Sequence, residues 1–82
     1  MVEKIQLQAL GEYWVDTANN SITVIQITTL PLSIYDEAGN LIAKLNNIYE
    51  TYTLNAGTGK YRIKNESTNA TQTVFIVRYY VY

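Results

Sequence analysis

Short apolar segments alternate with turn-forming residues along the whole chain, and this spacing constrains the fold more than any other feature. The segments are rich in Ile, Val, Leu, Tyr and Thr, and clusters of Asn, Asp, Gly, Ser or Pro separate them at roughly 8- to 12-residue intervals. Apolar residues at helical spacing are nearly absent. The chain is therefore predicted to be all-β: a single antiparallel β-sandwich domain over residues 1–82, jelly-roll or immunoglobulin-like, with seven or eight short strands.

The expected strands follow the apolar segments, at residues 5–9, 13–15, 22–30, 32–35, 41–45, 49–54, 60–65 and 71–82. The third strand changes phase, because Ile22 and Val24 share one face. Ile25 and Ile27 lie on the other face, which predicts either a bulge or a strand that is covered on both sides. Pro31 cannot donate a ladder hydrogen bond, so it marks a strand boundary or an edge.

The sequence "GTGK" at residues 57–60 resembles the end of a phosphate-binding loop. The full motif requires a glycine five positions before the second glycine and a Ser or Thr after the lysine. Leu54 and Tyr61 occupy those two positions, and a strand pattern follows where a helix should begin. We therefore interpret the segment as a hairpin turn in which Gly57 and Gly59 supply unusual backbone angles.

The strand after this turn carries a row of cations, and its neighbours alternate with them. Lys60, Arg62 and Lys64 are expected to point outward, while Tyr61 and Ile63 point into the core. A solvated outer face is the main interpretation of the row. Binding of an anionic group is the weaker alternative.

Two residue types that carry much of protein catalysis and metal binding are missing. The chain has no cysteine and no histidine, which excludes disulfides, thiolate and imidazole ligands and the usual nucleophile–base pairs. We therefore predict that the protein is not an enzyme and has no cofactor. Asp36 and Glu37 fall in a predicted turn with Asn40, where a solvated turn is the main interpretation and a calcium site the weaker one.

Charge and hydropathy limit the possible partners. The net charge is −1, so nucleic acid is not a predicted partner. No segment approaches the ~20 apolar residues of a membrane span, and residues 1–6 lack the hydrophobic run of a signal peptide. Small domains without disulfides or metal often gain stability from a partner chain, so we expect a homo-oligomer or contacts with other structural chains.

The C-terminal segment is apolar on both faces, which is unusual for a surface strand. One face holds Phe75, Val77, Tyr79 and Val81, and the other holds Val74, Ile76, Tyr80 and Tyr82. Such a strand is either central in the sheet with something packed outside it, or covered by another subunit, because an exposed one would aggregate. We predict a partner, with Val74, Ile76, Tyr80 and Tyr82 at the interface.

Aromatic and asparagine side chains provide further surface candidates. Trp14 and Tyr13 are candidates for a platform that stacks on a glycan or another surface ligand, although core or cross-strand packing is the alternative for most aromatics. Three N-x-[ST] sequons place possible glycans at Asn19, Asn65 and Asn69, all in predicted loops.

The second half of the chain resembles the pre-peptidase C-terminal-like domains, which are small extracellular β-sandwiches attached to secreted proteases and surface proteins. The resemblance covers residues 32–82 and is carried by "LSIYDEAGNLIAKL" and by "YTLNAGTGKYRIKNESTNATQTVFIV". It implies a β-sandwich that works outside the cell. The low share of charged residues, with many Ile, Tyr, Asn and Thr, also resembles virion and surface proteins of archaea.

These features favour a structural role over a catalytic one. We expect a small, non-enzymatic β-sandwich subunit of a virion or an extracellular or cell-surface assembly, which self-associates through apolar strand surfaces. The chain would reach that location by assembly into a particle, by another export route or as a processed fragment, while a cytoplasmic location stays open. The alternative is a module that binds carbohydrate or another surface ligand.

Overall fold

The computed structural model describes residues 1–80, and it contains eight strands and no helix in that part of the chain. The strands are β1 (Val2–Leu7), β2 (Glu12–Asp16), β3 (Asn20–Gln26), β4 (Leu32–Asp36), β5 (Leu41–Leu45), β6 (Thr51–Leu54), β7 (Lys60–Asn65) and β8 (Gln72–Tyr80). The all-β prediction is confirmed. Period-2 alternation and β-branched side chains determine these strands, and residues such as Gly39 and Gly57, which have positive φ angles, determine the turns between them.

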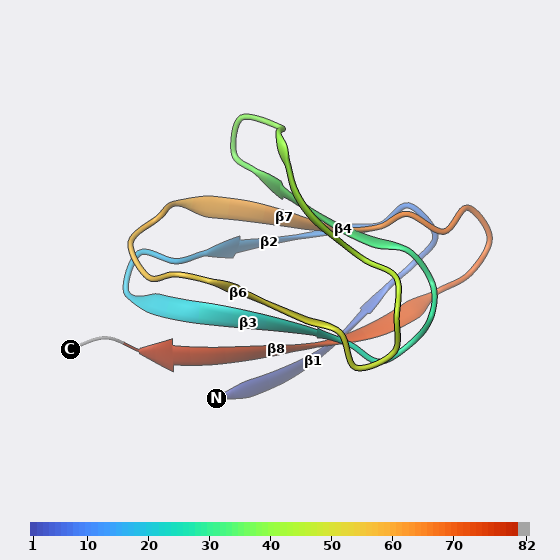
Figure 1. Ribbon diagram of the computed structural model, residues 1–82, viewed down its shortest axis with the longest axis horizontal. Helices are drawn as coiled ribbons and strands as arrows, with labels where there is room; N and C mark the ends of the chain where they lie inside the picture. Colours follow the sequence, from blue (N-terminus) through green and yellow to red (C-terminus); the bar gives the residue numbers. More distant parts are fainter. Residues whose placement is uncertain (81–82) are drawn as a thin grey trace.

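The strands form two four-stranded antiparallel sheets that pack face to face (Figure 1). One sheet has the order β1–β8–β3–β6 and the other β2–β7–β4–β5. Among consecutive strands only β4 and β5 share a sheet, so every other connection crosses from one sheet to the other. This connectivity is that of a jelly roll, and it replaces the immunoglobulin-like alternative, in which sequential strands more often pair directly.

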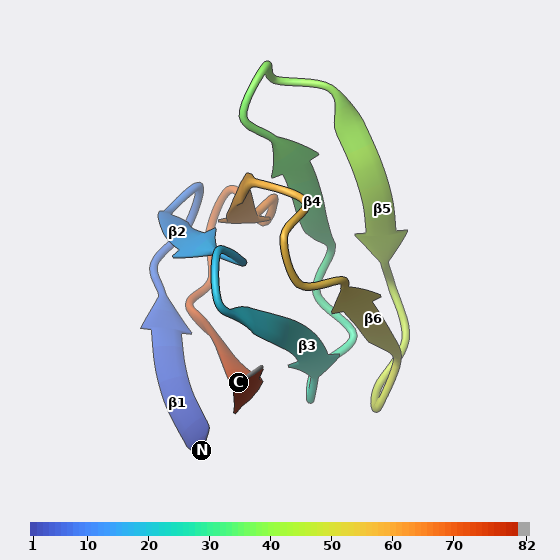
Figure 2. The same ribbon diagram turned by 90° about the vertical axis from the view of Figure 1, so that its left-hand side faces the viewer.

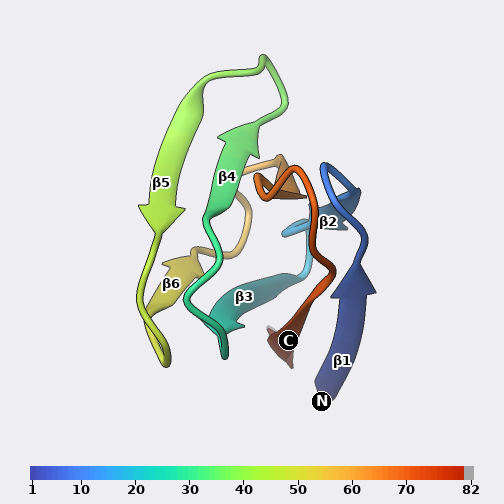
Figure 3. The ribbon, with the colours of Figure 1, turned by 90° about the vertical axis from the view of Figure 1, so that its right-hand side faces the viewer.

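The sandwich has two open edges. Figures 2 and 3 show β1 and β2 along one edge and β5 and β6 along the other, in agreement with the strand order of each sheet. The β4–β5 hairpin has a register shift between Ile34 and Tyr35. In Figure 3 the β4–β5 hairpin extends beyond the other strands of the sandwich.

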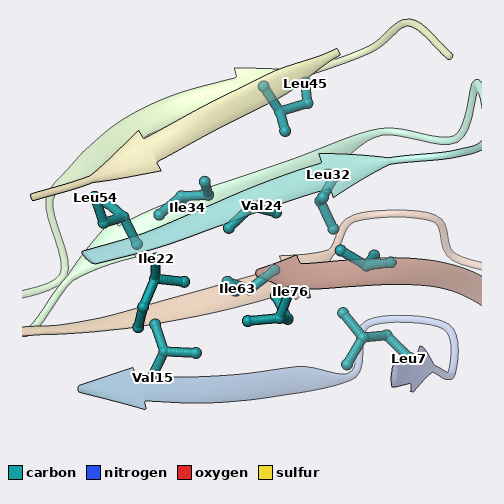
Figure 4. Close-up of a cluster of buried hydrophobic side chains, with 11 residues drawn as sticks. Leu7, Val15, Ile22, Val24, Leu32, Ile34, Leu45, Leu54, Ile63 and Ile76 are labelled. Atoms are coloured by element: carbon teal, nitrogen blue, oxygen red, sulfur yellow. The ribbon is translucent and has the colours of Figure 1, made fainter. Parts of the chain in front are cut away.

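The core lies between the two sheets and is entirely aliphatic (Figure 4). Its buried members are Leu7, Val15, Ile22, Val24, Leu32, Ile34, Leu45, Leu54, Ile63, Val74 and Ile76. The register of β3 is regular against both neighbours, so the phase change expected there is not a bulge. Ile22 and Val24 point inward, while Ile25 lies half-buried on the outer face.

The prediction that Val74 and Ile76 form an interface is wrong. Both side chains are 0% exposed and belong to the core, because β8 is an inner strand between β1 and β3 and this face of it meets the opposite sheet. Tyr80 is exposed at the end of β8, and Tyr82 lies outside the described residues. The outward side chains of β8 are instead those of Phe75, Val77 and Tyr79.

A buried amide cluster closes one end of the sandwich. Asn65 is 0% exposed, and its Nδ2 donates to the carbonyl oxygens of Leu7 and Gln8 at 3.0 Å each and of Ala70 at 2.8 Å. Its Oδ1 accepts from the Ser67 amide and from Gln72 Nε2. The prediction of a glycan at Asn65 is therefore wrong, because the amide nitrogen that would carry the sugar is buried and engaged in the fold.

The glycine-rich turn between β6 and β7 is fastened by Thr17, which follows β2. The Thr17 Oγ1 accepts from the amides of Thr58 (3.2 Å) and Gly59 (2.9 Å) and donates to the Gly59 carbonyl (2.6 Å). The Gly57 amide donates to the Thr17 carbonyl at 2.6 Å. Because Thr17 already occupies these three amides, the turn offers no free cradle for a phosphate. The interpretation as a hairpin turn is wrong, because the turn joins β6 of one sheet to β7 of the other, although Gly57 and Gly59 do adopt the expected positive φ angles.

Candidate functional site

The outer face of the β2–β7–β4–β5 sheet carries a row of two aromatic side chains with an arginine between them. Trp14, Arg62 and Tyr35 are direct cross-strand neighbours on β2, β7 and β4. The Arg62 guanidinium carbon lies 4.7 Å from the centroid of the Tyr35 ring, and its Nη1 donates to Glu12 Oε2 at 3.0 Å. These contacts hold the Arg62 guanidinium over the Tyr35 ring and beside the Glu12 carboxylate.

A second polar contact fixes the other end of the row. The Tyr35 hydroxyl donates to Glu66 Oε2 at 2.6 Å, and Lys64 Nζ lies 3.5 Å from Glu66 Oε1. The hydrogen bond from Tyr35 lowers the pKa of Glu66 below its ordinary value, against the opposing effect of burial. The same hydrogen bond, with partial burial, raises the pKa of Tyr35. The Glu66 carboxylate is thus held by Tyr35 and Lys64, whereas two buried atoms on the same face, Ser33 Oγ and Arg62 Nε, have no hydrogen-bond partner among residues 1–80.

An open cavity of about 440 Å³ lies at the free end of this row. It is lined by Trp14, Val15 and Asp16 of β2, by Glu37 of the β4–β5 turn and by Lys60 of β7. The Trp14 side chain is 53% exposed, although it is the largest apolar side chain in the molecule. The structure therefore brings Trp14, one of the predicted platform residues, together with three charged side chains.

Tyr13 does not share this face, so its predicted place in the platform is wrong. It is the sequence neighbour of Trp14, and alternation along β2 turns it inward. Its ring packs against the core, and its hydroxyl donates to Glu3 Oε1 at 3.3 Å. The expected orientation of Lys60, Arg62 and Lys64 toward the outer face is confirmed by the burial of the alternate residue Ile63.

The outer face of the β1–β8–β3–β6 sheet has a different character, and we call it the neutral face. Its side chains are those of Val2, Lys4, Gln6, Ser21, Thr23, Ile25, Thr51, Thr53, Thr73, Phe75, Val77 and Tyr79. Cross-strand pairing aligns Val2, Val77 and Thr23 in one row. The next row contains Phe75 and Ile25. Lys4 is the single charged side chain among these twelve.

Charge is distributed unequally between the two outer faces. The β2–β7–β4–β5 side carries four cations and four carboxylates, from Lys44, Lys60, Arg62, Lys64, Glu12, Asp16, Glu37 and Glu66. We call this side the charged face. Its formal charges cancel, so it has no net attraction for a polyanion such as nucleic acid. The sequence predicted the cationic row but not the carboxylates beside it, which come from other strands and loops.

The remaining candidate residues lie in turns. Asn19 and Asn69 are exposed, and glycosylation at these positions stays a prediction. Both carboxylate oxygens of Asp36 accept hydrogen bonds from Asn40, from its amide at 2.8 Å and from its Nδ2 at 3.0 Å, and these bonds lower the pKa of Asp36. Asp36 thus closes the hairpin on itself, as expected for a turn residue.

Residues 1–80 have neither a cluster of metal ligands nor a membrane-spanning helix. This part of the chain contains no group of three or more His, Cys, Asp and Glu side chains that could hold a metal ion. It contains no helix with the length and apolar character to cross a membrane. The interior between the sheets is filled by the aliphatic core, so both candidate surfaces lie on the outside of the sandwich.

Comparisons with known proteins extend only to the fold. No family model and no curated protein matches the sequence. Among solved structures, a de novo designed double-stranded β-helix matches with a TM-score of 0.77 and 18% identity, over 96% of this chain and 99% of the other. A cupin domain from Bordetella pertussis Tohama I matches with a TM-score of 0.66 and 23% identity, over 95% of this chain and 79% of the other.

The fold is a double-stranded β-helix. This name and jelly roll describe the same eight-stranded arrangement, which serves in capsid and lectin domains as well as in cupins. A shared fold does not imply a shared function, so function has to be argued from the two outer faces. The resemblance of residues 32–82 to pre-peptidase C-terminal-like domains stays a prediction.

Proposed function

We propose that the protein is a non-enzymatic structural subunit of a virion or an extracellular surface assembly, and that it self-associates through the neutral face. The observation that carries this proposal is the nearly uncharged outer side of β8 and its neighbours. Phe75, Val77 and Ile25 form a half-buried apolar centre on that side, and Val2 and Tyr79 are each 65% exposed beside it. A second copy of the chain would cover this apolar surface.

A second copy is the occupant that the charge pattern favours. Two neutral faces can meet without like-charge repulsion, because only Lys4 of each would have to avoid its counterpart, and it lies on the edge strand β1. The threonine hydroxyls around the apolar centre can pair across the interface. Two charged faces, in contrast, would bring eight ionised groups of each copy out of water.

The size of the neutral face sets the strength of the contact. Four strands about 4.8 Å apart and six residues at about 3.3 Å each give about 400 Å² per copy, or about 800 Å² in total. Stable interfaces bury ~1,200–2,000 Å², so one such contact is expected to be weak, with a dissociation constant in the upper micromolar to millimolar range. Weak contacts are suited to assemblies in which each subunit makes several contacts at once.

Sedimentation velocity tests this proposal. We expect the weight-average mass to rise above the 9.3 kDa of the single chain as the concentration increases from ~50 μM to ~1 mM, the range implied by the interface area. Val77→Lys places a cation at the centre of the neutral face in each copy, and like-charge repulsion should keep the chain at its monomer mass. Leu41→Lys adds the same charge to β5 of the other sheet, at a position that is 51% exposed, and should leave association unchanged.

Either of two sedimentation results would contradict the proposal. A wild-type chain that stays at monomer mass at the highest concentration would rule out self-association of this kind. Equal association of wild type and Val77→Lys would place the contact elsewhere. Circular dichroism establishes whether each variant is folded. If Val77→Lys does not fold, Tyr79→Asp replaces it, because Tyr79 is a more exposed position of the same face.

A further inference from the structure

The cavity beside Trp14 has a composition that self-association through the opposite sheet does not explain. Among residues 1–80, neither Glu37 nor Lys60 takes part in an ion pair, although other charged side chains of the same face do. Asp16 Oδ1 accepts a hydrogen bond from the Ala18 amide at 3.0 Å. The cavity thus combines a flat indole with two carboxylates and an ammonium group that make few hydrogen bonds or ion pairs within residues 1–80.

We propose that this cavity binds an uncharged saccharide, with one sugar ring stacked on the indole of Trp14. A sugar ring presents C–H groups on its faces and hydroxyls around its rim. The faces can cover apolar surface on Trp14, and the hydroxyls can both donate to Asp16 or Glu37 and accept from Lys60. The cavity volume of about 440 Å³ lies within the ~300–1,000 Å³ usual for small-molecule sites.

Charge selects a neutral ligand over charged ones. The two carboxylates oppose a phosphate, a sulfate or an acidic sugar at close range, and Lys60 opposes a cation. The bases of single-stranded nucleic acid could stack on Trp14 and Tyr35, but the backbone would also need a groove with net positive charge. The charged face has equal numbers of cations and carboxylates, and two of its cations, Arg62 and Lys64, already have carboxylate partners.

The strands give the site the rigidity that weak ligands require. Trp14, Val15 and Asp16 lie on β2, which pairs with β7 along its length, including Asp16 with Lys60. The Thr17 side chain holds the end of β2 to the turn that precedes Lys60. The backbone positions of Trp14, Asp16 and Lys60 are therefore fixed before a ligand binds, which reduces the entropy cost of binding.

Trp14 is the only tryptophan of the chain, so its fluorescence reports on this site alone. The probes are three neutral hexasaccharides, namely maltohexaose, cellohexaose and mannohexaose, and octathymidylate represents nucleic acid. We expect at least one hexasaccharide to shift the emission, with a dissociation constant of about 0.1–1 mM, as a small and open site allows. Raising the salt concentration should leave the affinity within about twofold, whereas nucleic acid binding would weaken steeply.

Variants assign the binding to the cavity, with isothermal titration calorimetry as the readout where the indole is removed. Trp14→Ala should weaken binding at least tenfold. Tyr49→Ala removes an aromatic ring that is 72% exposed but lies on the β5–β6 connection, and it should have no effect. Lys60→Met and Asp16→Asn should each reduce affinity by about three- to tenfold through a lost hydrogen bond.

Three results would overturn the proposal: no binding of any hexasaccharide at 5 mM (about five times the weakest affinity expected), binding that Trp14→Ala leaves unchanged, or tighter binding of octathymidylate than of the sugars. The proposal does not depend on self-association. Val77→Lys lies on the opposite sheet and should leave saccharide affinity as it is in the wild type.

Discussion

Thr17 offers a sharp test of how the glycine-rich turn is held. Thr17→Val keeps the branched shape of the side chain but removes the hydroxyl, which makes hydrogen bonds of 3.2 and 2.9 Å with the amides of Thr58 and Gly59 and of 2.6 Å with the Gly59 carbonyl. The backbone bonds from Thr17 to this turn remain in the variant. The change therefore isolates the contribution of one buried oxygen.

The expected cost follows from these three bonds. Each contributes about 0.5–1.5 kcal/mol net. Water can reach the Thr58 amide, because that residue is exposed, so we expect a total of about 2–3 kcal/mol. The free energy of unfolding of a domain of this size is about 4–12 kcal/mol, so the loss is a large fraction of it.

Urea unfolding measures the effect, and Thr17→Ser is the matched control. The serine keeps the hydroxyl and loses one methyl group, at a cost of about 1 kcal/mol. Hydrogen exchange should accelerate at the amides of Thr58 and Gly59 in Thr17→Val but not in Thr17→Ser. If Thr17→Val is within about 0.5 kcal/mol of Thr17→Ser, the hydroxyl does not hold the turn.

Two further substitutions probe the polar contacts of the fold. Tyr35→Phe removes the 2.6 Å hydrogen bond to Glu66 and should cost about 1 kcal/mol at pH 7 after allowance for partial exposure. Because that bond lowers the pKa of Glu66 in the folded state, its stabilisation is present above the ordinary pKa of 4.5 and is lost as pH falls through the lowered value. The wild-type and variant unfolding curves should therefore approach each other as the pH is lowered below 4.5, and a constant gap would contradict this. Asn65→Leu removes five hydrogen bonds, to three carbonyls, the Ser67 amide and Gln72 Nε2; although the Gln8 carbonyl and Gln72 Nε2 each keep a second partner, the loss should cost about 3–5 kcal/mol in urea unfolding. Asn69→Leu, at an exposed sequon, should change stability by under about 0.5 kcal/mol. Equal effects would show that the amide cluster contributes little.

The strands could be predicted because their signals are local. The segment at 41–45 is mostly apolar and the segment at 60–65 alternates cations with apolar residues, and β5 and β7 have the same bounds in the structure. The turns are marked by glycines that adopt positive φ angles. The order of the strands within the sheets is not a local property, because it depends on which apolar faces meet across the sandwich.

The orientation of β8 could not be read from its sequence. Both faces of the segment are apolar, and the face that enters the core also carries Gln72 and Arg78. These two polar groups are tolerated because distant residues satisfy them. Gln72 bonds to Asn65 and to the Pro31 carbonyl, and Arg78 pairs with Glu3 at 3.3 Å. Such partners become visible only when the fold brings them together.

Trp14 shows the opposite case, in which a usable signal was present. The residues in phase with it along β2 are Glu12 and Asp16, whereas Tyr13 alternates with them and is in phase with Val15. The charged phase predicts an outward tryptophan and the apolar phase an inward tyrosine. Asn65 had no comparable signal, because a sequon in a polar segment looks the same whether its amide is free or bonded to buried carbonyls.

The proposed self-association and the proposed saccharide site use opposite faces of the sandwich, so a test of one also tests the other. Because the sandwich has only two layers, a contact through the neutral face necessarily leaves the charged face, with Trp14, directed away from the interface. Association through the charged face would instead bury Trp14 and shift its emission to shorter wavelength. Emission that stays constant while the sedimenting mass rises is therefore expected of the wild type, and an assembled protein should bind saccharide as well as the monomer does. A blue shift that accompanies association would contradict both the interface and the accessible cavity at once.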